Sequence, residues 1–184
     1  QAGWLPGPDG MLYKDGKPLR FTVLTNQGNQ QRLMTAQIIQ QRLKMVGIDM
    51  RIRVVEWAAF IKEFINKGAF ESVLLAWQTS PDPDLFDVWH SSKTQPGELN
   101  FIGFSHPEVD RLLEVGRRSF DQRIRKKAYD RIQEILVEEQ PYTFLYIPDA
   151  LPVVAARVRG VTVTPAGIGH NTIRWYVPTI EQRY

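Results

Sequence analysis

The stretch FESVLLAWQTSPDPDLF, residues 70–86, changes within a few positions from an apolar strand to a rigid polar loop. Its run Val73-Leu74-Leu75-Ala76 is typical of a strand that is covered on both faces of an α/β sheet. We therefore predict that the strand from Phe70 to Trp77 is the central one. Open α/β sheets bind ligands at the carboxyl ends of their strands. The polar residues that follow this strand are Gln78, Thr79 and Ser80.

Two aspartates lie in the loop after these polar residues. Pro81 and Pro83 fix φ and hold the preceding residue extended, so Asp82 and Asp84 are presented on a stiff arm. Two interpretations stay open for their carboxylates: local bonds to backbone N–H groups in a turn, or contact with a ligand, which concerns Asp82 above all. Trp77 faces this polar loop, which favours ligand stacking over a place in the core.

The first half of the chain alternates between strand and helix patterns. Leu19–Thr25 and Ile48–Val54 alternate as strands, and the second has one polar face, as at a sheet edge. Helical spacing of apolar residues runs from Gln30 to Val46, where Gly47 ends it, and again from Trp57 to Ile65. Trp57 is predicted to lie in the core. This order indicates an α/β fold with a mostly parallel central sheet and helices on both faces.

The second half of the chain is predicted to be mainly helical before a strand-rich tail. Ser105 and Glu108 have the spacing of a capping box at the start of one helix, and Asp121 caps a longer helix that Pro141 ends. Tyr142–Ile147 is predicted to be a further strand. The remainder contains short apolar pieces separated by Gly and Pro.

Composition restricts the kinds of function. The 184 residues carry a formal net charge of +3 that is spread along the chain, which argues against a nucleic-acid partner. Cysteine is absent, which excludes disulfides and thiolate metal sites. No apolar run approaches the ~20 residues of a membrane helix, and no signal-peptide pattern is present at the start. We therefore predict no direct membrane span.

The sequence offers no catalytic motif. It contains no G-x-S-x-G, P-loop, H-E-x-x-H or G-x-G-x-x-G segment, and the three histidines have no ligand-spaced partners. We therefore predict that the chain is not an enzyme and uses no metal or other cofactor. The five basic residues between Arg123 and Arg131 are interpreted as a solvated helix face, because Asp130 and Glu134 lie on the same helix.

Several segments together resemble a known family. They are KDGKPL at 14–19, VGIDMRIRVVEW at 46–57, FESVLLAWQTSPDPDLF at 70–86, ELNFIGFSHPEVDRLLE at 98–114 and RKKAYDRIQEILVEEQPYTFLY at 125–146. In combination they are similar to the C-terminal lobe of the extracellular solute-binding proteins of the oligopeptide, dipeptide and nickel class, solute-binding protein family 5. These proteins deliver solutes to ABC importers.

The resemblance implies a lobe of the periplasmic-binding-protein type II fold. In that family two lobes close on the ligand like a hinge. Residues 1–155 would form the C-terminal ligand-binding lobe without its first elements, and residues 156–184 would be a tail that returns to the N-terminal lobe. A chain with one lobe would offer half of a ligand site.

The resemblance also bears on the ligand-binding residues. Trp77 matches the family's tryptophan just after the central strand, and peptide-binding members have an aspartate three residues later that pairs with the ligand's α-amino group. Here that position is Ser80. Either Asp82 takes over this charge or the ligand lacks an amino terminus. We predict that one wall of the cleft is formed by Trp77, Gln78, Ser80, Asp82, Asn26 and Gln27.

The function that the resemblance implies is substrate capture for an ABC importer of peptides or a related small solute. Two alternatives from other classes are the ligand-sensing domain of a regulator with the same fold and a small-molecule hydrolase. The implied partners are a peptide or small-molecule ligand, the N-terminal lobe and an ABC permease. The implied location is periplasmic or extracellular, with a lipid anchor in a Gram-positive organism. The tail is expected to pair with a second chain as a homodimer or to fold back over its own lobe.

Overall fold

The structure is a computed structural model that describes residues 2–78, 82–165 and 167–182. The chain divides into two compact units, Gln1–Pro141 and Tyr142–Tyr184. The first unit opens with a small antiparallel sheet of three short strands: β1 (Leu5–Pro6), β2 (Leu12–Lys14) and β3 (Lys17–Pro18).

A parallel sheet follows, in the strand order β5-β4-β6. Strand β4 (Arg20–Asn26) pairs along its whole length with β5 (Asp49–Val55) and over two residues with β6 (Ser72–Val73). The predicted α/β fold with parallel strands is therefore confirmed, and so is the edge position of β5.

The predicted centre of the sheet is wrong. Among the described residues β4 is the central strand, and β6 is a two-residue strand at the edge. The apolar run from Val73 to Leu75 is half-buried and Ala76 is exposed because, in the part of the chain that the structure describes, this run has a strand neighbour on one side only. Val73 and Leu75 pack in the cluster of Phe60 on one face of the sheet, and Leu74 packs in the cluster of Ala36 on the other. An apolar run alone does not distinguish cover by two strands from cover by side chains.

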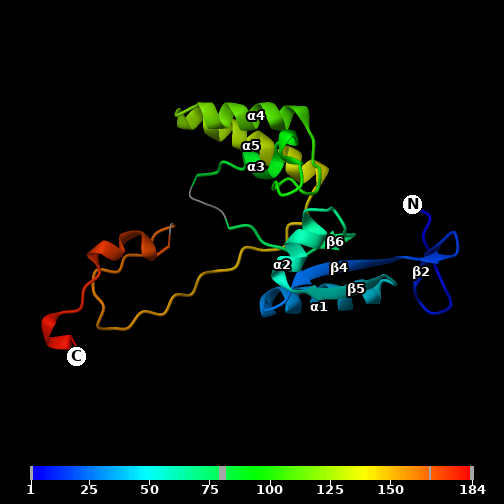
Figure 1. Ribbon diagram of the computed structural model, residues 1–184, viewed down its shortest axis with the longest axis horizontal. Coiled ribbons are helices and arrows are strands. Elements are labelled where there is room, and N and C mark those ends of the chain that lie inside the picture. Colours follow the sequence, from blue (N-terminus) through cyan, green and yellow to red (C-terminus); the bar gives the residue numbers. More distant parts are fainter. Residues whose placement is uncertain (1, 79–81, 166, 183–184) are drawn as a thin grey trace. The chain divides into compact units, whose positions relative to one another are not determined.

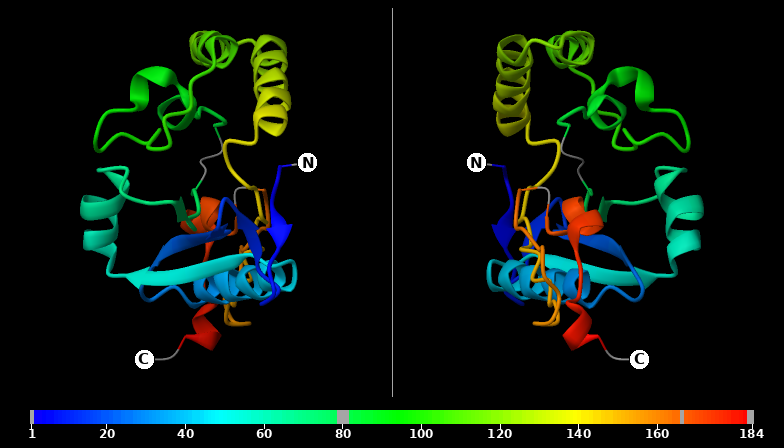
Figure 2. Two further views of the ribbon diagram at one scale, coloured as in Figure 1. Left: turned by 90° about the vertical axis from the view of Figure 1, so that its right-hand side faces the viewer. Right: turned by 90° about the vertical axis from the view of Figure 1, so that its left-hand side faces the viewer.

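Helices cover both faces of the sheet, as predicted (Figures 1 and 2). Helix α1 (Gln30–Met45) joins β4 to β5, and its Ala36 packs with Val23 and Met50 on one face. The helical segment formed by α2 (Trp57–Ala59) and η1 (Phe60–Ile65) joins β5 to β6, and its Phe60 packs with Leu24 on the other face. Val23 and Leu24 thus anchor opposite faces because successive side chains alternate along a strand.

Local sequence explains where these helices begin and end. Asn29 caps α1 by accepting a 2.9 Å hydrogen bond from the backbone N–H of Arg32. Gly47, at φ +80°, ends the helix as predicted, because a left-handed conformation there favours glycine.

The prediction that Trp57 lies in the core is wrong, because its side chain is 49% exposed. The helix changes to π-type hydrogen bonding at Phe60, and the N–H of Asn66 donates to the carbonyl of Ile61 five residues earlier. The extra residue in each π turn breaks the 3.6-residue spacing on which the prediction relied. Trp57 therefore falls outside the buried stripe that contains Phe60 and Ile65.

The remainder of the first unit is helical. It contains α3 (Phe86–Trp89), η2 (Ser91–Lys93), α4 (Pro107–Arg118) and α5 (Gln122–Glu139). The predicted cap at Asp121 is confirmed, with a 2.8 Å bond from the N–H of Arg123. The capping box at Ser105 is wrong. His106 caps α4 instead, and the carboxylate of Glu108 bonds Arg131 on α5.

The second unit has little regular structure. The predicted strand Tyr142–Ile147 is wrong, because among the described residues it pairs with no neighbouring strand. Two short 3₁₀ helices, η3 (Gly169–Arg174) and η4 (Thr179–Glu181), and one bridge between Arg159 and Tyr176 are present. Over the described residues, no helix has the length and apolar character needed to cross a membrane.

Candidate functional site

Four of the predicted site residues lie at or just beyond the carboxyl ends of the neighbouring parallel strands β4 and β6. Asn26 is the last residue of β4, and the N–H of Gln27 donates to the carbonyl of Val55 at 2.7 Å. After β6, the N–H of Leu74 donates to the carbonyl of Leu24, and the chain continues to Trp77 and Gln78. We call this region, formed by residues 26–27 and 77–78 with Phe101, the strand-end wall.

Trp77 supplies an accessible aromatic surface to this wall. Its side chain is 41% exposed, and its ring lies 6.1 Å from the ring of Phe101 with a tilt of 32°. Phe101 in turn contacts Phe70 edge to face at 6.1 Å. The tryptophan is therefore supported on one side by packed rings, an arrangement that leaves the rest of its surface available for stacking.

Sequence reasoning missed Phe101 and the residue that fixes it, Asn100. The Asn100 side chain is completely buried, donates to the carbonyls of His90 and Phe104 at 3.1 and 2.8 Å, and accepts from the N–H of Phe104 at 3.0 Å. The amide nitrogen thus donates two hydrogen bonds, and the amide oxygen accepts one. The sequence signal that could have identified Asn100 is its place inside the mostly apolar segment LNFIGF, because a turn-forming residue in such a segment usually has a structural role.

Asn26 is held in one orientation by its neighbours. Its amide N–H donates to the carbonyl of Gln27 at 2.9 Å, and its oxygen accepts from the Arg32 guanidinium at 2.6 Å. Gln27 and Gln78 are exposed at the same edge. Amide groups of this kind can donate to and accept from a polar, uncharged ligand.

The turn interpretation of Asp82 and Asp84 is confirmed. Asp82 accepts from the N–H of Asp84 at 3.0 Å, and Asp84 accepts from the N–H of Phe86 at 3.1 Å. Both carboxylates also form ion pairs, Asp82 with Arg125 at 2.7 Å and Asp84 with Arg117 at 2.8 Å. Ligand contact by Asp82 stays a prediction. The predicted contact Ser80 lies outside the described residues.

The histidines have local structural partners. His106 caps α4, and the ring of His90 stacks on Phe86 at 4.1 Å and accepts from the N–H of Ser92 at 3.1 Å. His170 lies near Thr164 and the carbonyl of Gly167. Across residues 2–78, 82–165 and 167–182, no group of three or more histidine and acidic side chains is placed to hold a metal ion.

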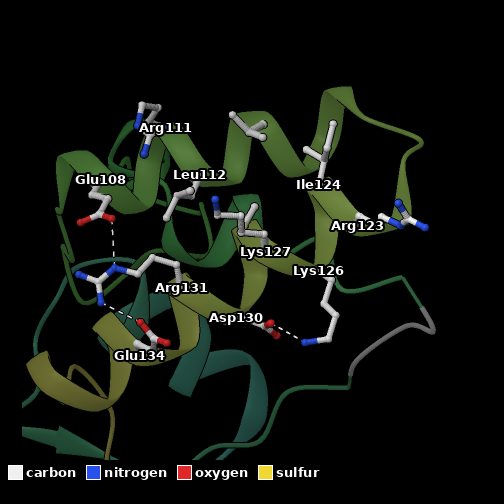
Figure 3. A pocket seen from close by; sticks show the side chains of 12 residues that line it. Glu108, Arg111, Leu112, Arg123, Ile124, Lys126, Lys127, Asp130, Arg131 and Glu134 are labelled. Carbon is white, nitrogen blue, oxygen red and sulfur yellow. Dashed lines mark hydrogen bonds and ion pairs between the residues drawn. The ribbon is translucent and has the colours of Figure 1, made fainter.

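A groove of about 860 Å³ runs between α4 and α5, outside the strand-end wall (Figure 3). Arg131 bonds Glu108 at 3.1 Å across it, which lowers the pKa of the Glu108 carboxyl, and it bonds Glu134 of its own helix at 2.9 Å. Lys126 pairs with Asp130. Lys126 and Arg131 therefore lie on a solvated face with acidic partners, as predicted, and screening makes each such pair a small contribution. The prediction is wrong for Arg125, whose side chain is only 14% exposed and pairs with Asp82.

Comparison with known proteins places these features in a family. Residues 1–98 match the family described as bacterial extracellular solute-binding proteins, family 5 Middle. The oligopeptide-binding protein AppA of Bacillus subtilis is 34% identical over 179 residues, which cover 96% of this chain and 33% of that protein.

Two solved structures are similar to this chain. One is B. subtilis AppA in complex with a nonapeptide, with a TM-score of 0.74, 35% identity, and coverage of 96% of this chain and 35% of that one. The other is NikZ from Campylobacter jejuni in complex with Ni(L-His), with a TM-score of 0.71, 25% identity, and coverage of 95% and 36%. The chain thus spans about a third of the length of these relatives.

Proposed function

The chain belongs to the bacterial extracellular solute-binding proteins of family 5, and we propose that it forms one wall of the ligand site in a substrate-capture protein of an ABC importer. The family is one of solute-binding proteins and not of enzymes. The observation that carries the proposal is the strand-end wall, where an exposed, ring-supported Trp77 is flanked by amide side chains. Open α/β sheets bind their ligands at this edge.

Each residue of the wall has a role in this proposal. Trp77 provides stacking area, and Asn26, Gln27 and Gln78 orient the ligand by hydrogen bonds. The proposal also includes the hydroxyl of Ser80 and the carboxylate of Asp82, which bonds Arg125, as ligand contacts. Small-molecule sites typically combine an apolar surface with a few well-placed polar groups in this way.

We propose a peptide as the ligand class. The support is the similarity to AppA, which was solved with a nonapeptide. The remaining parts of the proposal follow the family. A second lobe would cover the ligand from the opposite side, a permease would receive it, and the protein would act outside the cytoplasm, with a lipid anchor in a Gram-positive organism.

Residues 1–155 are proposed to form the C-terminal lobe, and residues 156–184 a tail that returns to the other lobe. The tail carries exposed apolar side chains, including Ile173 at 95% exposure, which supports pairing with a further segment or a second copy. Sedimentation of the protein that carries this sequence, at low micromolar concentration, tests the pairing. A monomer at all concentrations would contradict the homodimer.

The ligand proposal is tested by calorimetry on the protein that carries this sequence. The probe is a nonapeptide selected from a synthetic pool by thermal shift. Trp77→Ala is expected to weaken binding by about tenfold or more because it removes the stacking surface. Trp57→Ala is the matched control, since Trp57 is also about half exposed but lies outside the wall, and it should change affinity by less than about twofold. Equal losses in both variants would refute the assignment.

A further inference from the structure

The turn between α4 and α5 carries a concentration of positive charge. Residues 117–127, RRSFDQRIRKK, contain six arginines or lysines and one acidic residue, so this segment has a formal charge of +5, whereas the whole chain has +3. The excess positive charge of the chain is therefore located at this turn. We use the name basic corner for the exposed surface formed by Arg111, Arg118, Phe120, Arg123, Ile124 and Lys127.

Three of the six cations in this segment are paired within the protein. Arg117 bonds Asp84 at 2.8 Å, and Arg125 bonds Asp82 at 2.7 Å. Lys126 pairs with an aspartate of its own helix. These three positive charges are compensated and contribute little attraction toward a partner.

The cations of the basic corner are not compensated in this way. Among the residues that the structure describes, Arg111, Arg123 and Lys127 form no ion pair with a carboxylate. Arg118 is 80% exposed and reaches Glu114 of its own helix at 3.4 Å, a pair that solvent screens. Arg123 is the second residue of α5, where the helix dipole disfavours a positive charge, so helix stability does not explain its place.

The cations of the basic corner border an apolar surface. Arg111 lies on α4, Arg123 and Lys127 lie on α5, and the Lys127 side chain reaches toward α4 (Figure 3). Arg118 comes seven residues after Arg111, so it continues the same face of α4. Apolar side chains line the same groove of about 860 Å³, namely Leu112, Val115, Ile124 and Ala128. The groove thus has positive charge at its borders and apolar groups between them.

Phe120 adds an aromatic ring to these cations. It lies in the short turn between α4 and α5 and is 100% exposed, and Ile124, four residues later, is 47% exposed. Segments that bind at membrane surfaces combine Lys and Arg with Phe, Leu or Trp, because the cations attract anionic headgroups while the apolar side chains enter the headgroup boundary. A protein partner would instead have to cover about 800 Å² of this unit with a matching surface. The wholly exposed ring on a turn favours the lipid surface.

We propose that the basic corner contacts an anionic phospholipid surface, with Arg111, Arg123 and Lys127 at the phosphate headgroups and Phe120 inserted between the headgroups. The chain belongs to a family of bacterial extracellular proteins, for which the surface within reach is the outer face of a membrane. Attraction of this kind is reversible and raises the concentration of the protein at the membrane. The contact is separate from the strand-end wall and does not depend on which solute that wall receives.

The test is cosedimentation of the protein that carries this sequence with vesicles of phosphatidylcholine alone or with about one third phosphatidylglycerol. The measured quantity is the ratio of the two partition coefficients, because a ratio cancels any binding that does not depend on lipid charge. It should be about tenfold or more at low salt and should fall as the salt concentration rises. Equal partition into both kinds of vesicle would overturn the proposal.

Two double variants locate the contact. Arg123→Gln/Lys127→Gln removes two cations of the basic corner and should lower the ratio by about tenfold. Arg42→Gln/Lys44→Gln removes the same charge from exposed positions of α1, and should lower the ratio by less than about twofold. Equal falls in both variants would show that only the net charge matters and would overturn the assigned surface.

The role of the ring has its own pair of variants. Phe120→Ser should weaken binding to the anionic vesicles by about threefold or more, whereas Met45→Ser, at a position that is 76% exposed on α1, should leave it unchanged. Equal results in the two variants would overturn insertion of the ring. An acidic peptide that binds where vesicles do not, and that Arg123→Gln/Lys127→Gln releases, would assign the basic corner to a protein partner instead. Affinity for the nonapeptide should be the same in all four variants, so failure of this proposal and failure of the ligand proposal are distinguishable.

Discussion

The two units of the chain each contain a buried asparagine, but these residues work in different surroundings. In the first unit, Asn100 fixes a loop, and several apolar side chains of the same unit are almost completely buried, among them Phe60, Val109 and Ile135. In the second unit, Asn171 donates to the carbonyl of Gly160 and to Thr162 and accepts from the Trp175 indole at 2.9 Å. Among the described residues of that unit, no apolar side chain is buried.

The comparison shows that the hydrogen bonds of a buried amide do not replace the stabilisation of an apolar core. A hydrogen bond formed on folding replaces bonds to water with a bond between protein groups and contributes about 1 kcal/mol net, whereas burial of a large apolar side chain contributes about 1.5–3 kcal/mol. The first unit has both contributions, and its amide fixes a loop on an existing core. In the second unit the amide fixes local geometry, and most of the stability of the chain should therefore reside in residues 1–141.

The largest expected effect is in the core of the first unit. Phe60→Ala removes a ring of η1 that is completely buried against Leu24 of β4, so the free energy of unfolding should fall by about 3–5 kcal/mol. Urea denaturation followed by circular dichroism measures this loss. A loss below about 1 kcal/mol would mean that the core collapses around the missing ring, and would remove the contrast between the units.

Asn100→Ala should have the next largest effect, a loss of about 2–3 kcal/mol. The substitution leaves the carbonyls of His90 and Phe104 and the N–H of Phe104 without their amide partner in a buried place. Asn171→Ala is the matched comparison and should change the main unfolding transition by less than about 0.5 kcal/mol, because Asn171 is outside the first unit. Equal losses would show that both units unfold together.

Much of the fold could be predicted from local sequence because the relevant signals are local. The spacing from Gln30 to Val46 predicts α1 to within one residue, and Asn29 and Gly47 mark its ends. The centre of the sheet could not be predicted in this way, because Val73–Ala76 has the same apolar run whether strands flank it on one side or on both. The prediction that Trp57 lies in the core failed for a related reason. The change from α to π geometry at Phe60 leaves no pattern in residue type.

The candidate site shows the same limit. Trp77, Gln78, Asn26 and Gln27 could be proposed because strand ends are visible in the sequence and parallel strands end at one edge. Phe101 could not, since it comes from a loop that reaches the wall through tertiary contacts with Phe70 and Trp77. The partners of Asp82 were also inaccessible, because Arg125 lies 43 residues away in the chain.

A smaller effect is expected from pH. The hydrogen bond from Arg20 and the charges of Arg20 and Arg51 hold the pKa of the Asp49 carboxyl below its ordinary value of 3.8. Because the pKa is lower in the folded state, the stabilisation is present above pH 3.8 and is lost as pH falls through the folded value. Both side chains are partly exposed, so the loss should not exceed about 1 kcal/mol.

Urea midpoints measured between pH 6 and the acid range, with Asp49→Asn as control, test this effect. The variant should lose that part of the pH dependence which belongs to Asp49, while its β4 and β5 strands stay paired through their backbone. A variant with the same pH profile as wild type would show that other carboxylates account for the dependence. Glu181→Gln, in the second unit, should leave the profile of the main transition unchanged.

The smallest effect is predicted for Ile173→Ala. Its side chain is 95% exposed in the chain, so its truncation removes almost no buried surface and should change the free energy of unfolding by less than about 0.5 kcal/mol at low protein concentration. Repeating the measurement over a range of concentrations makes the test sharper. If the tail pairs with a second copy, Ile173 becomes buried there, and the loss should grow as concentration rises. A loss above about 1 kcal/mol in dilute solution would instead show that Ile173 is covered within one chain, and that the second unit has an apolar core after all.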